Sequence, residues 1–173
     1  MSENIILIGY MGVGKGRTGR ILAAKTPYFV VDTDDLIESF SKMKVKKIFS
    51  RHGEAYFREL ELQTAQWLEQ SVRSTIISTG GGFFKVANIR QIGRVVYLHA
   101  EFKTIIDRML SHPNTKKIIK KRPLLKDMDR ARALYDQRLP QYRQVADLEV
   151  SLEGRSLDQV TAEIIEKLGL AGI

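Results

Sequence analysis

The hydrophobic residues of the chain form two kinds of pattern that alternate along its length. Short apolar and β-branched runs predict buried strands, because strands covered on both faces read as continuous hydrophobic segments. These runs are Asn4–Ile8, Phe29–Val31, Thr75–Ser78, Val95–Leu98 and Leu148–Val150. Longer stretches with one apolar face predict helices at Arg17–Lys25, Glu54–Ser71, Glu101–Ser111, Asp129–Tyr142 and Ser156–Leu168. The alternation predicts an α/β fold in which a mainly parallel sheet of about five strands lies between two layers of helices.

Two segments do not fit this simple alternation. Residues 33–60 contain two further helix-like pieces joined by a charged turn, and we expect them to form a small cap. Residues 112–124 are polar, basic and bounded by prolines, which predicts either a mobile lid or an ordinary exposed loop. The 173 residues contain no internal repeat and no long linker, so we expect one domain that includes the cap and the lid.

Composition narrows the classes of protein and of partner. The chain has no cysteine, which excludes disulfides and cysteine metal sites. No apolar stretch approaches the roughly 20 residues of a membrane span, and no basic region precedes the first apolar run as in a signal peptide, so we expect a cytoplasmic protein without membrane contact. The net charge of +8 predicts an anionic partner or simply high solubility. Because the basic clusters are not interleaved with aromatic residues, we expect no nucleic acid partner.

The segment GYMGVGKG, Gly9 to Gly16, follows the first predicted strand and precedes the first predicted helix. Its first seven residues match the pattern G-x-x-x-x-G-K in the structural context that this pattern requires. Backbone N–H groups of such a loop and the helix N-terminus bind phosphates, and the lysine, here Lys15, neutralises the β- and γ-phosphates. We therefore expect a nucleotide to bind at Gly12, Val13, Gly14, Lys15, Gly16 and Arg17.

Gly16 departs from the usual loop. The residue after the lysine is ordinarily Ser or Thr, whose hydroxyl binds Mg²⁺ directly, and glycine has no side chain for this purpose. Asp32, at the carboxyl end of the second strand, could instead orient the water shell of the ion. Arg17 could add positive charge beside the phosphates. The alternative is a loop that has kept its shape and lost its chemistry.

Further candidates lie at strand ends and on helices. Asp34 could accept a hydrogen bond or a proton from a substrate hydroxyl, although Asp32 or Asp34 could merely cap a helix. Arg58 shares a predicted helix face with Phe57 and Glu61, and it could bind a carboxylate in a bidentate manner or form an ordinary helical ion pair. The glycines after the third strand could bring backbone N–H groups to a ligand; they are Gly80, Gly81 and Gly82.

Residues nearer the C-terminus add two candidate ligands for anions. Arg122 ends the predicted lid and could stabilise the charge of a phosphoryl group in the transition state. Arg138 could hold a second anionic group. We interpret the three histidines as structural or exposed, because none has a catalytic or metal-binding partner nearby in the sequence. Trp67 has apolar neighbours on a predicted helix, and we expect it in the core.

Taken together, these segments resemble the shikimate kinase family. The matching motifs are GYMGVGK, DTD at Asp32–Asp34, GEAYFRELE, STGGG, KRPLL and QRLPQY, in the family's order and spacing over nearly the whole chain. The resemblance implies a three-layer αβα P-loop fold of the nucleoside-monophosphate-kinase type. It also implies ATP- and Mg²⁺-dependent phosphorylation of the 3-hydroxyl of shikimate, a step of aromatic amino-acid synthesis.

The resemblance assigns roles on the substrate side of the site. The residue that matches Asp34 contacts the reacting hydroxyl. Those that match Arg58 and Arg138 bind the shikimate carboxylate, and Gly81 contributes a backbone donor.

On the nucleotide side, the resemblance places Arg122 in a lid that reaches the phosphates and Arg155 near the adenine end. The family's hydroxyl ligand of Mg²⁺ maps to Gly16, so that role is not carried over. Two alternatives stay open: a related small-molecule kinase of the gluconate-kinase type, and a degenerate homologue that binds nucleotide weakly and serves as an interaction module. We expect a monomer.

Overall fold

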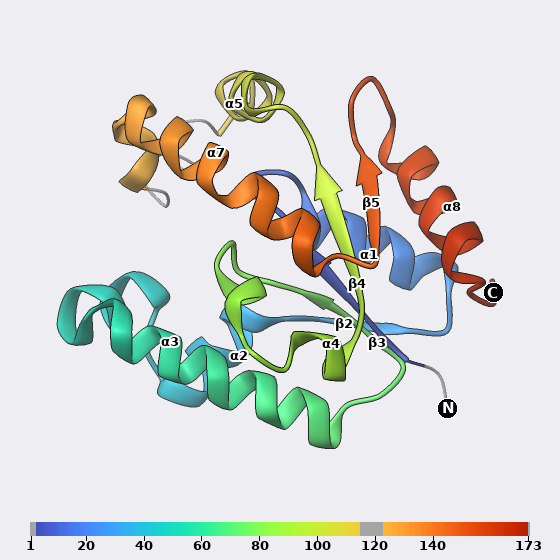
Figure 1. The fold of residues 1–173 in the computed structure, drawn as a ribbon, viewed down its shortest axis with the longest axis horizontal. Coiled ribbons are helices and arrows are strands. Elements are labelled where there is room, and N and C mark those ends of the chain that lie inside the picture. Colours follow the sequence, from blue (N-terminus) through green and yellow to red (C-terminus); the bar gives the residue numbers. More distant parts are fainter. Residues whose placement is uncertain (1–2, 115–122, 173) are drawn as a thin grey trace.

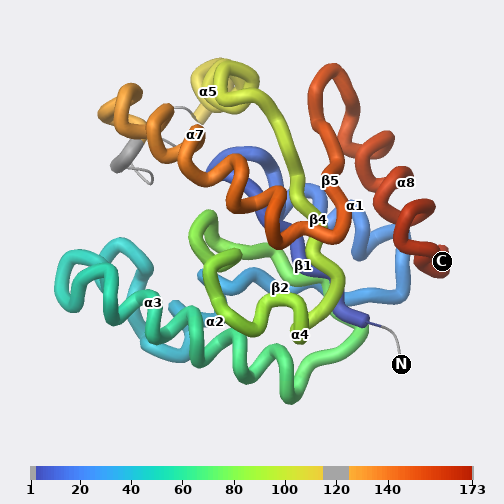
Figure 2. Tube along the Cα trace, in the orientation of Figure 1, coloured from blue at the N-terminus to red at the C-terminus, as the bar shows by residue number. Residues whose placement is uncertain are grey.

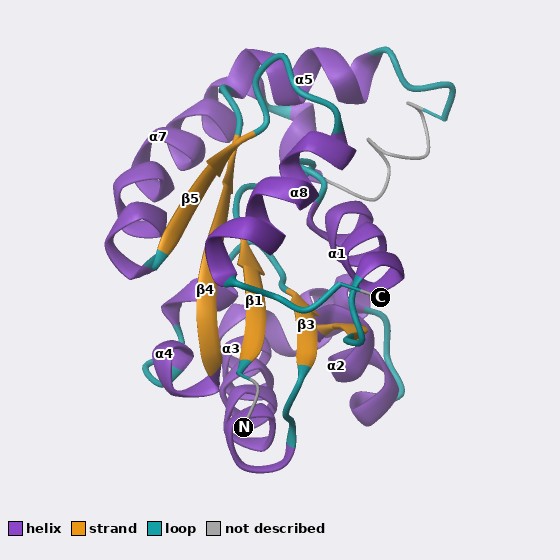
Figure 3. Cartoon of the chain, turned by 90° about the vertical axis from the view of Figure 1, so that its right-hand side faces the viewer, coloured by secondary structure: helices purple, strands orange, loops and turns teal. Residues whose placement is uncertain are grey.

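The computed structural model describes residues 3–114 and 123–172. Within these ranges the chain forms a five-stranded, wholly parallel sheet in the order β2-β3-β1-β4-β5, with helices on both faces (Figures 1 and 3). The strands are β1 (Asn4–Ile8), β2 (Phe29–Asp32), β3 (Thr75–Ser78), β4 (Gly93–His99) and β5 (Leu148–Ser151). The predicted αβα sandwich with a parallel sheet is confirmed.

The helices form two layers around this sheet. Helices α1 (Lys15–Lys25) and α8 (Leu157–Leu168) pack side by side over one face (Figure 2). Helices α3 (Val45–Ser71) and α7 (Met128–Val145) lie on the other side of the sheet (Figure 1). The remaining elements are α2 (Thr33–Ser41), α4 (Ile89–Ile92), α5 (Phe102–Leu110) and two short 3-10 turns, η1 (Phe83–Lys85) and η2 (Pro123–Lys126). No helix in the described ranges is long and apolar enough to cross a membrane.

The path of the chain creates a crevice beside β1. From β1 the chain enters α1 on one face of the sheet, whereas from neighbouring β3 it continues toward α4, which packs against α3. The loops after the two strands therefore diverge at the carboxyl edge of the sheet. Ligands of open α/β sheets bind at such a switch point, and here it lies between the glycine loop after β1 and the glycines after β3.

The segment predicted as a cap consists of α2 and the first part of α3. Its apolar side chains form a small cluster of their own, made of Ile37, Ile48, Phe57 and Leu60. Helix α3 starts at Val45, nine residues before its predicted start at Glu54, because a kink at Gly53 joins two helical arms. The backbone of Gly53 has φ +81°, a value that favours glycine.

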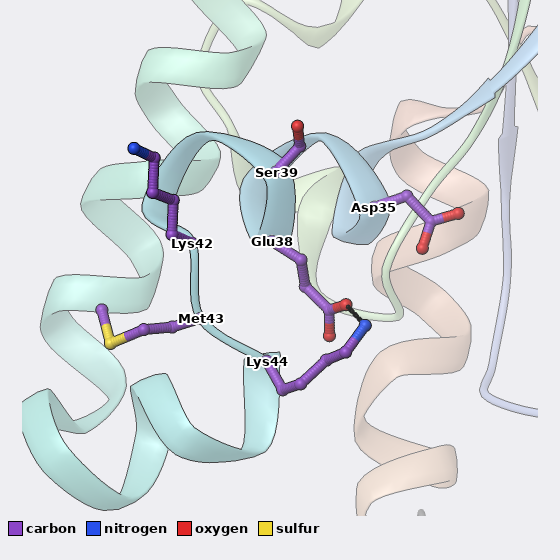
Figure 4. Close-up of a pocket in the computed structure, with 6 residues that line it drawn as sticks. All are labelled: Asp35, Glu38, Ser39, Lys42, Met43 and Lys44. Carbon is purple, nitrogen blue, oxygen red and sulfur yellow. Dashed lines mark hydrogen bonds and ion pairs between the residues drawn. The ribbon is translucent and has the colours of Figure 1, made fainter.

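The turn between α2 and α3 is closed by Glu38. Its carboxylate accepts a hydrogen bond from Lys44 Nζ at 2.5 Å (Figure 4). It also accepts one from the backbone N–H of Val45 at 3.0 Å. The hollow beside this turn is lined by Asp35, Ser39, Lys42 and Met43 together with this pair. We therefore assign Glu38 to the start of α3, whose first N–H groups need acceptors, with Lys44 holding its carboxylate in place.

Trp67 is not a core residue, and this prediction is wrong. Its side chain is 47% exposed, whereas the buried positions of this part of α3 are Glu61, Ala65 and Leu68. These three are spaced by four and three residues and define the buried face. Trp67 precedes Leu68 by one residue, which turns it about 100° away from that face. Most of the predicted lid, including Arg122, lies outside the described residues.

Candidate active site

A cavity of about 400 Å³ opens at the carboxyl edge of the sheet. It is enclosed by the glycine loop, the ends of β2 and β3, and α5. Its lining contains predicted site residues from three separate segments: Gly12, Gly14, Lys15, Gly16, Arg17, Asp32, Asp34, Gly80 and Gly81. The structure therefore brings together the phosphate-binding loop, the two aspartates and the first glycines after β3.

The glycine loop has the backbone that phosphate binding requires. Gly12 and Gly14 have φ values of +80° and +107°, which only glycine adopts without strain. Gly14 precedes α1, and no side chain of the described residues caps this helix N-terminus. Its free N–H groups are therefore available to an anion in the cavity. The side chain of Val13 is fully buried, so only its backbone can contact a ligand.

Lys15 lies folded against the loop that precedes it. Its ammonium donates to the carbonyl oxygens of Gly9 at 2.7 Å and Tyr10 at 3.2 Å, and the side chain is buried. Arg108, from α5, donates to the carbonyl oxygen of Val13 at 3.2 Å. Burial and the nearby charge of Arg17 lower the pKa of Arg108. Several cations thus crowd around this end of the cavity, where a polyphosphate would relieve their repulsion.

Asp32 caps a helix and also lines the cavity. Its Oδ1 accepts a hydrogen bond from the backbone N–H of Asp34 at 2.9 Å, as the N-cap of α2. Its Oδ2 accepts a hydrogen bond from the hydroxyl of Ser78 at 2.8 Å. The interpretation of Asp32 as a helix cap is therefore confirmed, and two donors hold its carboxylate in one orientation at the cavity wall.

Asp34 carries an oxygen that is poised for a ligand. Its Oδ1 is buried and accepts no hydrogen bond from any residue that the structure describes. Burial, together with the charges of Asp32 and Glu61, raises the pKa of Asp34 to about 7 against the opposing charge of Lys15. A buried polar atom without a partner is uncommon in proteins, and a carboxyl with a pKa near neutrality is suited to exchange a proton with a substrate.

Each of the three glycines after β3 makes room for one charged side chain. A Cβ at Gly80 would lie 2.7 Å from Asp34 Oδ1, a Cβ at Gly81 would lie 3.2 Å from Arg138 Nη1, and a Cβ at Gly82 would lie 2.4 Å from Arg58 Nη1. These side chains come from α2, α7 and α3. The loop is tied to α2, since the N–H of Gly80 donates to Thr33 Oγ1 at 3.1 Å. The triple glycine is therefore the surface on which a carboxyl group and two guanidinium groups converge.

Arg58 and Arg138 lie against the glycines that follow β3, next to the cavity. Arg58 forms ion pairs with Glu61 at 2.6 Å and with Glu54 at 2.7 Å. Of these partners, Glu61 is buried and Glu54 is exposed. Arg138 is buried and donates to the carbonyl oxygen of Gly81 at 3.1 Å, while its Nε is buried and makes no hydrogen bond to any described residue. Both guanidinium groups thus lie beside the three glycines, and Arg138 keeps one buried donor without a described acceptor.

Two predicted residues lie outside the wall of the cavity. Phe57 packs in the hydrophobic cluster of residues 33–60, with the Arg58 guanidinium 5.6 Å from its ring centroid. Arg155 is held in the loop before α8, where it donates to Glu163 at 2.5 Å and to the carbonyl oxygen of Ser151 at 3.1 Å. The cavity is lined instead by Leu157, and also by Arg108 and His112, none of which belongs to a motif that we recognised in the sequence.

The residues around the cavity suit a magnesium ion that binds together with a nucleotide. In residues 3–114 and 123–172, no three or more acidic or histidine side chains come together as a metal site. Mg²⁺ usually keeps several waters and takes one or two protein oxygens in addition to substrate phosphates. Asp32 and Ser78, held together beside the glycine loop, offer oxygens of this kind.

Several known proteins are similar to this chain in sequence. A family model described as shikimate kinase matches residues 11–169. A shikimate kinase of Helicobacter hepaticus is 35% identical over 95% of each chain. One of Sulfurihydrogenibium sp. is also 35% identical, over 96% of this chain and 98% of its own.

Solved structures agree with the sequence relatives. The shikimate kinase of Bacteroides thetaiotaomicron has a TM-score of 0.83 at 27% identity and covers 97% of this chain and 99% of its own. The enzyme of Acinetobacter baumannii, solved in complex with shikimate, has a TM-score of 0.80 at 29% identity, with 97% and 93% covered. The family match spans most of the residues and includes relatives above 30% identity over nearly the whole length, so this chain belongs to the shikimate kinase family.

Proposed function

We propose that this chain transfers the γ-phosphoryl group of ATP to the 3-hydroxyl of shikimate, with Mg²⁺ as the metal cofactor. The observation that carries the proposal is the convergence of Asp34, Arg138 and Arg58 on the three glycines after β3, beside the phosphate-binding loop. Shikimate carries one carboxylate and several hydroxyls on a small ring. Two guanidinium groups and one proton acceptor match those features.

On the substrate side, Arg58 and Arg138 bind the carboxylate and Asp34 receives the hydroxyl. The substrate carboxylate replaces exposed Glu54 on Arg58, while buried Glu61 keeps the guanidinium oriented. Asp34 Oδ1 accepts a hydrogen bond from the 3-hydroxyl and then its proton. The hydroxyl oxygen attacks the γ-phosphorus while the bond from the γ-phosphorus to the β,γ-bridging oxygen breaks, and ADP leaves. The pKa of about 7 leaves much of Asp34 ionised at neutral pH and still basic enough for this step.

On the nucleotide side, the chain supplies positive charge and fixed N–H donors. The glycine loop and the start of α1 hold the phosphates, with Lys15, Arg17 and Arg108 around them. The Mg²⁺ that binds with ATP neutralises part of the phosphate charge, and Asp32 would help to hold it. We propose that Arg122 also approaches the phosphates. Phosphoryl transfer depends on positioning and charge stabilisation, so no phospho-enzyme is required.

Two features bear on the alternatives. A kinase of the gluconate type would also bind a small carboxylate, and only the fit of the ring distinguishes the two substrates. A degenerate homologue would have no reason to keep an Asp34 with a raised pKa and a buried oxygen that accepts no hydrogen bond from any described residue. We also propose that the protein acts as a cytoplasmic monomer without a nucleic acid partner, because the candidate site described here is built within one chain.

The test is a substrate panel with identification of the product. The chain is incubated with Mg-ATP and shikimate, shikimate methyl ester or gluconate, and phosphorus–proton coupling in NMR spectra locates the new phosphate. We expect product from shikimate with phosphorus on O3, and little product from the ester, which lacks the charge that the arginines bind. Product from gluconate alone would support the first alternative, and no product from any compound would support the degenerate module.

A further inference from the structure

We propose that Ser78, at the end of β3, supplies the hydroxyl ligand for the Mg²⁺ of Mg-ATP that Gly16 cannot supply. The inference rests on the proposed function only in that a nucleotide binds at the glycine loop together with the ion. It concerns a residue outside the loop, on the neighbouring strand. The hydroxyl of Ser78 on β3 would thus take the place of the Ser or Thr hydroxyl that usually binds Mg²⁺ from the loop.

Ser78 lies close to the space beside Gly16. A Cβ built on Gly16 would lie 3.8 Å from Ser78 Oγ and 3.5 Å from Arg20 Nη1, and no other described side chain comes within 4 Å. Ligands of Mg²⁺ lie about 2.0–2.1 Å from the ion, so two atoms that share one ion are at most about 4 Å apart. The hydroxyl of Ser78 therefore lies within one coordination shell of the place where a side chain at position 16 would begin.

The hydroxyl of Ser78 is held in one orientation by Asp32. Ser78 donates its hydrogen to Asp32 Oδ2 at 2.8 Å, and Asp32 is itself fixed by the N–H of Asp34 at 2.9 Å. A hydroxyl has one hydrogen and two lone pairs, so donation to the carboxylate leaves the lone pairs for a cation. Hydrogen bonds from a ligand to a carboxylate orient the ligand and strengthen it as a donor to the metal. Ser78 and Asp32 thus hold each other in an orientation that suits Mg²⁺ binding.

Arg20 is the competing explanation for the missing hydroxyl. It lies one helical turn after Gly16 on α1, and its guanidinium approaches the space that glycine leaves open. A guanidinium carries only donors and is always protonated, so it cannot bind a metal ion. It could instead take over part of the charge neutralisation, in which case nucleotide affinity would depend little on the ion. This outcome is measurable and differs from the one that we propose.

The chain permits a direct test of metal ligation because it has no cysteine. Ser78→Cys introduces a single thiol, and thiolate ligands prefer Cd²⁺ to Mg²⁺. In the presence of ADP, we expect Cd²⁺ to produce a thiolate-to-metal absorption band and to bind about tenfold more tightly than to the natural protein. The matched control is Thr75→Cys at the other end of β3, where the hydroxyl bonds to the carbonyl oxygen of Arg73.

The control should show no ADP-dependent band. The proposal would be overturned if Ser78→Cys showed no thiolate-to-metal absorption band, or if its band were equally strong without ADP.

A second set of variants tests the same point without a thiol. Mn²⁺ replaces Mg²⁺, and the free ion is counted by EPR in the presence of ADP. Ser78→Ala should weaken Mn²⁺ binding about tenfold and leave the affinity for ADP without metal unchanged. Gly16→Ser added to Ser78→Ala should restore Mn²⁺ binding, since the hydroxyl then returns on the loop.

These outcomes separate the inference from the proposed function. If the natural protein binds no ADP with or without metal, the proposed function fails. If ADP and Mn²⁺ bind normally to Ser78→Ala, only the inference fails. If Arg20→Gln removes ADP affinity while Ser78→Ala leaves Mn²⁺ binding intact, the compensating group is Arg20, and the proposal for Ser78 is overturned.

Discussion

Replacing Asp34 with Asn should stabilise the folded protein while it removes catalysis. Burial, with help from Asp32 and Glu61, raises the pKa of Asp34 from 3.8 to about 7. An acid with a raised pKa binds its proton more tightly in the native state than in the unfolded state. The stability that this proton provides is fully present below the unfolded pKa of 3.8, and it is lost as the pH rises to about 7. At higher pH, folding buries a charge.

The size of the effect follows from the shift. A change of one pKa unit corresponds to about 1.4 kcal/mol, so a shift of about three units costs about 4 kcal/mol above pH 7. Asn does not titrate, but its buried amide needs partners, which returns about 1–3 kcal/mol. We expect Asp34→Asn to be about 1–3 kcal/mol more stable than the natural protein at pH 8. The difference should fall by about 2.5 kcal/mol between pH 8 and pH 5, where native Asp34 is protonated, so that Asn is then neutral or slightly destabilising.

Urea unfolding at pH 5, 6, 7 and 8 measures this difference, with exposed Asp35→Asn as the control that should show no such trend. The reasoning is refuted if the free energy of unfolding of Asp34→Asn exceeds that of the natural protein by the same amount at pH 5 and pH 8, or if Asn destabilises at pH 8. Turnover should fall by about 10²–10⁴-fold, as for loss of a general base, with ADP affinity retained. Near-normal turnover would exclude Asp34 as the base.

Three further predictions concern Arg58, its exposed partner Glu54, and the glycines at positions 80 and 16. Arg58→Lys keeps the positive charge beside buried Glu61 but loses the planar guanidinium that can bind a carboxylate through two N–H groups. It should raise the KM for shikimate about tenfold and leave the KM for ATP unchanged. An unchanged KM for shikimate would show that Arg58 does not bind the carboxylate. Glu54→Gln, in contrast, should lower that KM by at most about fivefold, because an exposed ion pair is broken. Gly80→Ala should reduce turnover strongly, since its Cβ would lie 2.7 Å from Asp34 Oδ1. Gly16→Ala should fold normally and lose less turnover, because the nearest side-chain atom outside its chain neighbours lies 3.5 Å from its Cβ. Equal turnover in the two variants would contradict this geometry.

The local patterns of the chain predicted most of the fold. The central strands β1 and β3 are short apolar runs that are buried at every position, and burial on both faces leaves a direct mark on the sequence. The glycine loop was recognisable because its residues are adjacent along the chain. Helix α3 was predicted too short, since a glycine usually ends a helix, whereas Gly53 only kinks this one.

The parts that the sequence did not reveal depend on the path of the chain. The motifs indicated Asp34, Arg58 and Arg138 separately, but only the fold shows that one glycine faces each of them. Arg108 reaches the cavity from α5 without any local signal, because a single arginine on an amphipathic helix is ordinary. In the sequence, Ser78 stands out only as the first residue of the STGGG motif. Its nearness to Gly16 arises from the pairing of β1 with β3.

The central claim is that the glycine loop works with Gly16 in place. It is tested most directly by the rate of shikimate-dependent ADP release with Mg-ATP, measured for the natural chain and for Gly16→Ser side by side. We predict turnover by the natural chain in the range of about 1–100 s⁻¹ that is typical of kinases, with Gly16→Ser similar or modestly faster. Turnover by Gly16→Ser together with none by the natural chain would contradict the account and identify the protein as a degenerate member of its family.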